Sequence, residues 1–170
     1  AGFYYKTFMW PKSFWYKVYE PFIRKAAGLG VASLKKDNER YEHKYEYCDL
    51  LVTGSGPGGL ASAYAAAKNG AKVILAEDKP RFGGSLLTDD VTIDNLSGKA
   101  WTDKIISELK EMPNVIVKNR SQVFGYYDHN MTVMFERTGD HLEKKSKYTP
   151  RQRLWYIRAK EVLLSTGSIE

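Results

Sequence analysis

Hydrophobic and polar positions predict a strand, a helix and a second strand in the middle of the chain. Two short apolar runs, 50–53 and 72–76, indicate buried strands. The alanine-rich stretch between them, about 58–69, indicates a helix that packs through small side chains, and Gly70 is suited to end it. A helix of this length between two apolar strands predicts a βαβ unit with parallel strands.

The apolar pattern returns to a helical period after a long polar loop. A helix is expected over about 100–111, ended by Pro113 and followed by a short strand at 115–117. One face of this helix is apolar: Trp101, Ile105, Ile106 and Leu109.

Beyond Gln122 the period shortens to about two residues, which is typical of strands. Residues 123–127 and 131–136 read as two arms of an antiparallel hairpin with a turn at 128–130. Further strands are expected at 151–159 and 162–164. The chain therefore predicts an antiparallel meander placed between parallel strands.

The junction of the first strand and helix carries a G-x-G-x-x-G motif. Gly54 permits a tight turn, Gly56 lets a pyrophosphate approach the backbone, and Gly59 lets the helix pack closely on the sheet. The helix N-terminus adds free N–H groups and a positive dipole end for the phosphates. The predicted phosphate cradle comprises Gly54, Ser55, Gly56, Pro57, Gly58 and Gly59.

An acidic residue ends the second strand, where a dinucleotide's adenosine ribose would lie. Glu77 follows Gly59 by eighteen positions and can accept hydrogen bonds from ribose hydroxyls, while repelling a 2′-phosphate. NAD or FAD is therefore favoured over NADP, although Lys79 and Arg81 close by weaken that exclusion. The other predicted cofactor contacts are Asp78, Arg81, Gly83, Gly84, Ser85, Val123, Thr166 and Gly167.

These elements together predict an α/β fold, a Rossmann-like FAD/NAD(P)-binding domain of the glutathione-reductase-like kind, with a parallel sheet plus an antiparallel meander. The domain is expected over 48–170 as an incomplete first portion, ending in a segment, 165–168, similar to the A-T-G element of two-dinucleotide-binding flavoproteins. A glycine-rich turn in some other α/β protein is the alternative.

Residues 1–47 are expected to form an aromatic-rich connecting or docking segment, with 35–46 as a polar surface linker into the first strand. Packing against another domain or subunit is favoured, and stacking on single-stranded nucleic acid or lying at a membrane interface are the alternatives. The aromatic residues in its first twenty positions are Phe3, Tyr4, Tyr5, Phe8, Trp10, Phe14, Trp15, Tyr16 and Tyr19.

Composition indicates the class of protein and its expected location more than its activity. Of the 170 residues 43% are hydrophobic and 27% charged, as in a globular domain, and no apolar run approaches the roughly 20 residues of a membrane span. The net charge of +6 favours acidic or phosphate-bearing partners without establishing nucleic-acid binding. Cys48, the single cysteine, excludes an internal disulfide, and a reducing cytoplasmic location is expected.

No residue of the chain is predicted to be catalytic or to bind a metal. The histidines, His43, His129 and His141, lack partners at metal-ligand spacing. His129 beside Asp128 is the best acid/base candidate, but a hairpin turn explains the pair without chemistry. Ser55 and Ser85 follow glycines without forming a nucleophile elbow.

Four segments outside the glycine motif resemble the alpha subunit of the bacterial heterotetrameric sarcosine oxidases, and the resemblance runs in order along nearly the whole chain. Nucleotide binding demands none of them, which makes them more specific than the motif. They are Phe3–Pro11, Ile23–Gly30, Val123–Asn130 and Arg151–Trp155.

The resemblance implies that this chain binds NAD noncovalently and that FAD, FMN and zinc lie on partner subunits or interfaces. It also implies partners, the beta, gamma and delta subunits, and a reaction that converts sarcosine to glycine with hydrogen peroxide and methylene-tetrahydrofolate. No residue here can be assigned to folate. The alternatives are an FAD-dependent pyridine-nucleotide reductase of the thioredoxin-reductase type and a noncatalytic nucleotide-binding interaction subunit.

Overall fold

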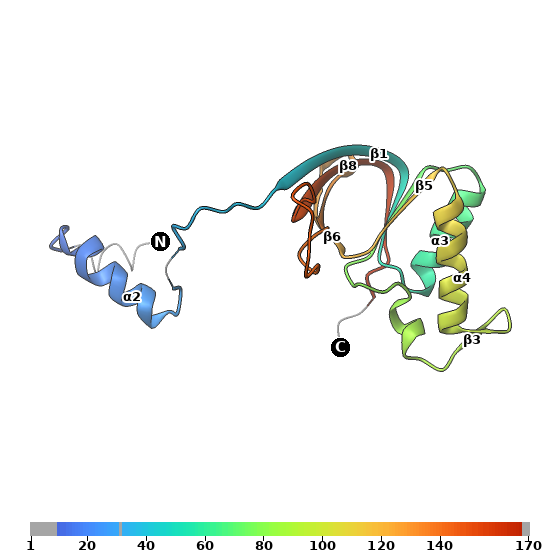
Figure 1. The fold of residues 1–170 in the computed structure, drawn as a ribbon, viewed down its shortest axis with the longest axis horizontal. Helices are drawn as coiled ribbons and strands as arrows, with labels where there is room; N and C mark the ends of the chain where they lie inside the picture. Colours follow the sequence, from blue (N-terminus) through green and yellow to red (C-terminus); the bar gives the residue numbers. More distant parts are fainter. Residues whose placement is uncertain (1–9, 31, 168–170) are drawn as a thin grey trace. The chain divides into compact units, whose positions relative to one another are not determined.

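The computed structural model describes residues 10–30 and 32–167 and divides the chain into two compact units, residues 1–38 and 39–170 (Figure 1). Some positions singled out in the sequence, Phe3, Tyr4, Tyr5, Phe8 and Ser168, lie outside the described residues.

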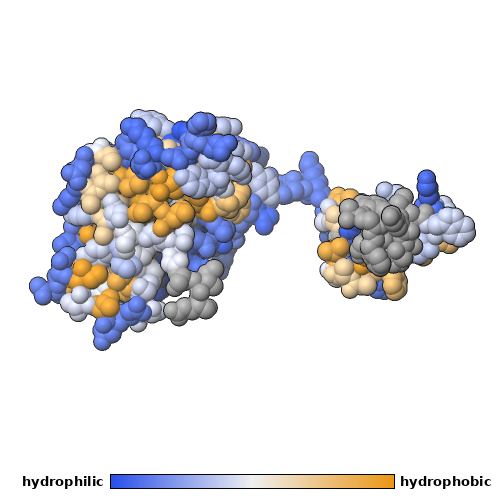
Figure 2. Space-filling view, turned by 180° about the vertical axis from the view of Figure 1, so that it is seen from behind, coloured by the Kyte–Doolittle hydropathy of each residue, from blue (hydrophilic) through white to orange (hydrophobic). Residues whose placement is uncertain are grey.

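Within residues 10–30 and 32–38 the smaller unit has one helical segment, and much of the apolar surface there is exposed. A turn of π-helix, η1 (Trp15–Tyr19), leads into α2 (Glu20–Ala26), and neither contains a buried residue. Figure 2 shows apolar surface, in orange, on this unit. The exposed large apolar side chains among its described residues are Trp10, Phe14, Tyr16, Val18, Phe22, Leu29 and Leu34. A segment this short therefore has no core of its own among its described residues.

A six-stranded mixed sheet forms the larger unit. Its first four strands are parallel and its last three form an antiparallel meander, with β8 belonging to both sets. The order across the sheet is β5 (Val115–Lys118), β2 (Val73–Ala76), β1 (Tyr41–Thr53), β8 (Gln152–Leu164), β7 (Met131–Arg137) and β6 (Ser121–Tyr127). A short hairpin, β3 (Thr92–Ile93) and β4 (Leu96–Ser97), lies outside the sheet.

Two helices cover one face of the parallel strands: α3 (Pro57–Lys68) and α4 (Gly98–Glu111) (Figure 1). Their apolar residues pack with Val52, Val73 and Leu75 into one core. Leu60 and Leu109 are fully buried there. This core fixes the first turn of α3 at the end of β1, where the glycine motif lies.

The opposite face of the same strands packs against the meander. Leu51 and Ile74 meet Met134, Trp155 and Ile157 in a second core, and all five side chains are at most 1% exposed. Figure 1 shows β1 and β8 bending together as they leave the parallel part of the sheet. The two cores cover the faces of the sheet. The loops that follow β1, β2 and β8 meet at the ends of these strands.

The predicted fold class, an α/β Rossmann-like FAD/NAD(P)-binding domain with a meander, is confirmed. Two predicted element boundaries are wrong. Residues 41–46 are not linker but the first half of β1, paired along Tyr41–Cys48 with Gln152–Ala159. The strands predicted separately at 151–159 and 162–164 are the single strand β8, because β1 offers a continuous partner along its whole length.

Candidate dinucleotide-binding site

Two glycines of the motif are required by contacts with neighbouring backbone. Gly54 has φ of +100°, and a Cβ there would lie 2.2 Å from the carbonyl oxygen of Ser165. A Cβ on Gly59 would lie 2.1 Å from the carbonyl oxygen of Gly54. These distances are far inside van der Waals contact, so the turn from β1 into α3 closes only with glycine at both positions.

Gly56 is free of such contacts, and this difference indicates where a ligand fits. Its backbone is extended (φ −64°, ψ 179°), it is the N-cap of α3, and a Cβ there would have no neighbour within 4 Å. Pro57 begins the helix. The first N–H groups of a helix have no partner within it, and beside Gly56 they face open space of the kind in which helix N-termini bind anions.

Ser55 and Glu77 form a buried polar pair beside this space. Glu77 Oε2 accepts hydrogen bonds from the Ser55 backbone N–H (2.9 Å) and hydroxyl (2.5 Å), and Glu77 Oε1 accepts one from the N–H of Lys79 (2.9 Å). Ser55 is fully buried and Glu77 is 8% exposed. A carboxylate has about four acceptor positions, so Glu77 keeps capacity for a ribose hydroxyl.

The glycine pair after β2 lies against the same loop. The N–H of Gly83 donates to the carbonyl oxygen (3.0 Å) and hydroxyl (3.1 Å) of Ser55, and a Cβ on Gly84 would lie 3.1 Å from the Cα of Gly56. Both glycines have positive φ. Ser85 is exposed in the 3-10 turn η2 (Gly84–Leu87) that follows.

The end of β8 reaches the motif from the other side. The Ser165 N–H donates to the carbonyl oxygen of Thr53 (2.8 Å), and the Ser165 hydroxyl would lie 3.5 Å from a Cβ on Gly58. Thr166 and Gly167 come next, and Gly167 has φ of +77°. Segments around residues 55, 77, 83 and 165 are thus gathered at the start of α3.

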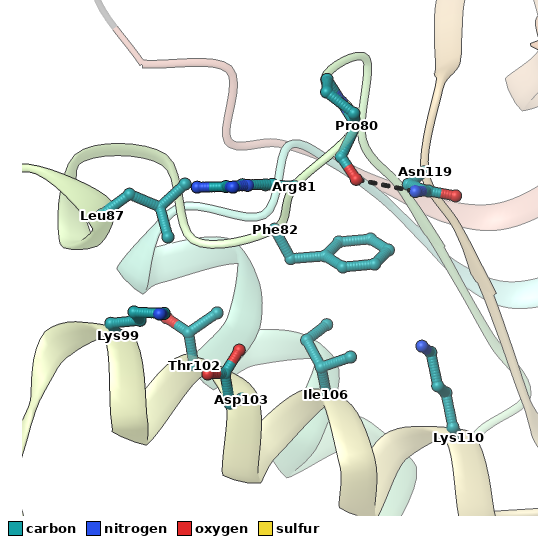
Figure 3. Close-up of a pocket in the computed structure, with 10 residues that line it drawn as sticks. All are labelled: Pro80, Arg81, Phe82, Leu87, Lys99, Thr102, Asp103, Ile106, Lys110 and Asn119. Carbon is teal, nitrogen blue, oxygen red and sulfur yellow. Dashed lines mark hydrogen bonds between the residues drawn. The ribbon is translucent and has the colours of Figure 1, made fainter. Parts of the chain in front are cut away.

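Three predicted site residues have other surroundings. The carboxylate of Asp78 pairs with Arg137 (3.0 Å), which also donates to the Asp78 carbonyl oxygen (2.7 Å). Arg81 lines a hollow beside α4 (Figure 3), and Val123 packs against the second core. Sequence reasoning missed Arg137, because a contact spanning 59 positions leaves no local signal.

The two residues considered as candidates for catalysis, His129 and Cys48, occupy positions that the local structure explains. His129 occupies a left-handed position (φ +59°) in the exposed turn between β6 and β7. Cys48 is fully buried, and burial raises the pKa of its thiol to about 12. Across residues 10–30 and 32–167, no group of three or more His, Cys, Asp or Glu side chains could hold a metal ion. Nor does a helix in that part have the length and apolarity to span a membrane.

This strand–glycine loop–helix, with an acidic residue ending the second strand, defines a dinucleotide-binding oxidoreductase fold. The family of FAD dependent oxidoreductases matches residues 49–142, and the chain belongs to it.

Among individual proteins the chain is similar to sarcosine oxidase alpha subunits, as the four segments indicated. It is 48% identical over 170 residues to "Sarcosine oxidase subunit alpha" of Rhizobium meliloti (strain 1021), covering all of this chain and 17% of that protein. It is 37% identical over 146 residues to the protein of the same name from Corynebacterium sp. (strain U-96), covering 85% of this chain and 15% of the relative. The chain therefore spans about a sixth of the length of these relatives.

Solved structures support the fold alone. L-proline dehydrogenase from P. horikoshii superposes with a TM-score of 0.59 at 20% identity, covering 83% of this chain and 26% of that one. A thioredoxin reductase from Gloeobacter violaceus gives 0.50 at 18% identity, covering 73% of this chain and 35% of that one.

Proposed function

We propose that the chain is the NAD-binding portion of the alpha subunit of a sarcosine oxidase complex. The observation that carries the proposal is the open space beside Gly56, at the start of α3 and next to the Ser55–Glu77 pair. At Gly54, Gly59 and Gly84, by contrast, a Cβ would meet neighbouring backbone.

The residues present fit the ADP half of a dinucleotide. The N–H groups at the start of α3 would receive the pyrophosphate, and Gly84 would lie along it. Glu77 would accept from the adenosine ribose through its remaining lone pairs. In this proposal Ser85 borders the pyrophosphate, and Thr166 and Gly167 close the far end. Asp78, Arg81 and Val123 take no part in it, because their side chains lie at Arg137, in the hollow beside α4 and against the second core. A bound nicotinamide or flavin ring would supply hydride or electron transfer.

The activity of the whole complex is a proposal from the resemblance. It is the oxidative demethylation of sarcosine to glycine, with hydrogen peroxide and methylene-tetrahydrofolate as the other products. The relatives are named as alpha subunits, which supports a complex of several subunits. That the partners are beta, gamma and delta subunits, with FAD, FMN and zinc at their own sites or interfaces, is proposed from the resemblance alone. A cytoplasmic location fits the single buried cysteine.

FAD is the second candidate for this cradle, because the matching family is described as FAD dependent. The Glu77 and Gly83–Gly84 arrangement accepts the shared ADP half of either molecule. NAD and FAD therefore differ only in the half beyond the ADP, the nicotinamide or flavin half, which the described residues do not enclose.

The test identifies the ligand that this part of the protein retains. The complex is purified, denatured and its released nucleotides are identified by mass spectrometry, for the parent and for Gly56→Val. Loss of NAD alone in the variant supports the proposal, and loss of FAD alone supports the second candidate. Full retention of both nucleotides in a folded Gly56→Val protein contradicts dinucleotide binding in this cradle.

The exposed apolar residues of the smaller unit support a docking role for the N-terminal segment. Deleting residues 1–20 should dissociate the partner subunits and spare the dinucleotide content. Size-exclusion chromatography with subunit analysis measures the first effect. An intact complex after the deletion would contradict this role.

A further inference from the structure

We propose that the hollow beside α4 is a second binding site, separate from the dinucleotide cradle, for a small phosphate monoester. The hollow has a volume of about 440 Å³. It is formed by the loop after β2, the exposed side of α4 and the residue that follows β5 (Figure 3). Its charged lining residues are Arg81, Lys99, Asp103 and Lys110.

The charges of this lining match a phosphate dianion. Three cations and one carboxylate leave a net charge of +2, and a phosphate monoester carries a charge of about −2 at neutral pH. In the described part of the chain the nearby ion pairs are Lys79–Asp78 and Arg137–Asp78, and none involves a cation of the hollow. These cations are therefore not neutralised by the protein and are free to pair with a ligand.

An aromatic ring divides the hollow and gives it a second recognition feature. Figure 3 shows Phe82 in the middle, with Lys110 at one end and Lys99 and the guanidinium of Arg81 toward the other. Lys110 Nζ lies 5.9 Å from the centre of the Phe82 ring. A planar group can pack on this ring while its phosphate reaches Arg81 and Lys99 at one end, and a guanidinium binds phosphate oxygens in pairs.

The floor also contains a polar atom without a partner. Thr102 is 1% exposed, and its Oγ1 makes no hydrogen bond within the described residues. A buried hydroxyl is normally satisfied, so a ligand oxygen or a water beneath the ligand would complete it.

The hollow and the cradle lie on opposite sides of the Gly83 turn. On one side the Gly83 N–H bonds to Ser55, and on the other a Cβ on Gly83 would meet Leu87 and Thr102 at 3.1 Å. Both of these neighbours line the hollow. The second site therefore does not need the dinucleotide proposal to be correct.

Isothermal titration of the intact protein with phenyl phosphate and inorganic phosphate tests the site. Arg81→Gln with Lys99→Gln should raise the dissociation constant for phenyl phosphate by about tenfold, because these two cations lie at the same end of the hollow and both can contact the phosphate. Asp103→Asn should lower it, because a repelling carboxylate is removed. Phenyl phosphate should bind more tightly than inorganic phosphate, and Phe82→Leu should remove that preference.

Lys104→Gln is the matched control, because Lys104 is an exposed residue of α4 that does not line the hollow. Equal losses in Lys104→Gln and in the double variant would show unspecific attraction to a basic surface and overturn the proposal. An unchanged dissociation constant in the double variant would overturn it as well. Thermal melts of each variant confirm that a loss of binding does not reflect a loss of folding.

Discussion

Ser55 holds the carboxylate of Glu77 by two hydrogen bonds to the same oxygen, one from its backbone N–H at 2.9 Å and one from its hydroxyl at 2.5 Å. The same hydroxyl accepts from the N–H of Gly83 at 3.1 Å. A single serine between two glycines thus joins the phosphate loop to the proposed ribose acceptor and to the glycine pair. All three segments carry predicted cofactor contacts.

Ser55→Ala should weaken both the fold and dinucleotide binding. It removes a hydrogen bond to a buried carboxylate, a loss of about 1.5–3 kcal/mol in the free energy of unfolding. Glu77 is then held only by the backbone N–H groups of Ser55 and Lys79 and is positioned less firmly for the ribose, so we expect dinucleotide affinity to fall by about tenfold. Urea denaturation measures the first effect and titration calorimetry the second. Ser107→Ala, on the exposed side of α4, is the control that should change neither.

A double-mutant cycle tests whether Ser55 supports dinucleotide binding by positioning Glu77 or independently of Glu77. If Ser55 acts through Glu77, then Ser55→Ala should have little further effect on affinity in a protein that already carries Glu77→Ala. Strictly additive losses would contradict the positioning role of Ser55, even if the dinucleotide proposal holds.

The three motif glycines should respond differently to alanine. Gly54→Ala and Gly59→Ala place a methyl group 2.2 and 2.1 Å from backbone oxygens, so both should lower the melting temperature strongly or prevent folding. Gly56→Ala meets no protein atom within 4 Å and should melt close to the parent. Calorimetric melts of the three variants measure the difference. A Gly56→Ala protein as unstable as the other two would show that the space beside Gly56 is not open.

The glycine motif and its flanking strands could be predicted because each depends on local sequence. Apolar runs identify β2 and β5, and the spacing of three glycines reflects contacts within one turn. The first half of β1 was missed because charged residues occupy every second position from Glu42 to Glu46. The rings of Tyr41, His43, Tyr45 and Tyr47 alternate with these charges at a period of two, and this was the available strand signal.

The polar contacts of the site could not be read from sequence. Ser55 and Glu77 are 22 positions apart, and Asp78 and Arg137 are 59 apart. Such pairs depend on how the sheet brings the ends of β1, β2 and β7 together. Arg81 was predicted at the cofactor from its nearness in sequence to Glu77, yet its side chain lines the hollow of α4. Spacing identifies the loop, and packing decides which way each side chain points.

Cys48 should resist thiol reagents in the folded protein. The side chain is fully buried, and burial raises the pKa of its thiol to about 12, so almost no thiolate exists at pH 8. We expect Cys48 to remain unmodified by iodoacetamide until denaturant is added, and then to react fully. Peptide mapping by mass spectrometry measures the modified fraction at this position. Rapid labelling without denaturant would show that the middle of β1 opens readily.

Glu136 is a buried acidic residue of β7 that bonds to side chains of β5 and β8. Its carboxylate accepts from Lys118 (3.0 Å), Arg153 (3.1 Å) and the indole N–H of Trp155 (2.6 Å). Burial would raise the pKa of Glu136, but the bond and charge of Lys118, with Trp155 and Arg153, outweigh it and lower the pKa below 4.5.

Glu136→Gln should therefore destabilise the protein by about 2 kcal/mol at neutral pH, since hydrogen bonds to charged groups contribute about 1.5–3 kcal/mol. A carboxyl whose pKa is lower in the folded state stabilises the fold above its unfolded value of 4.5, and this contribution is lost as the pH falls through the lower folded value. The parent should thus lose stability faster than Glu136→Gln on acidification, and the two curves should converge. Urea denaturation between neutral and acidic pH measures both curves, with Glu143→Gln, on an exposed loop, as the control. Parallel curves with a constant gap would show that the carboxylate charge has no part in the stabilisation.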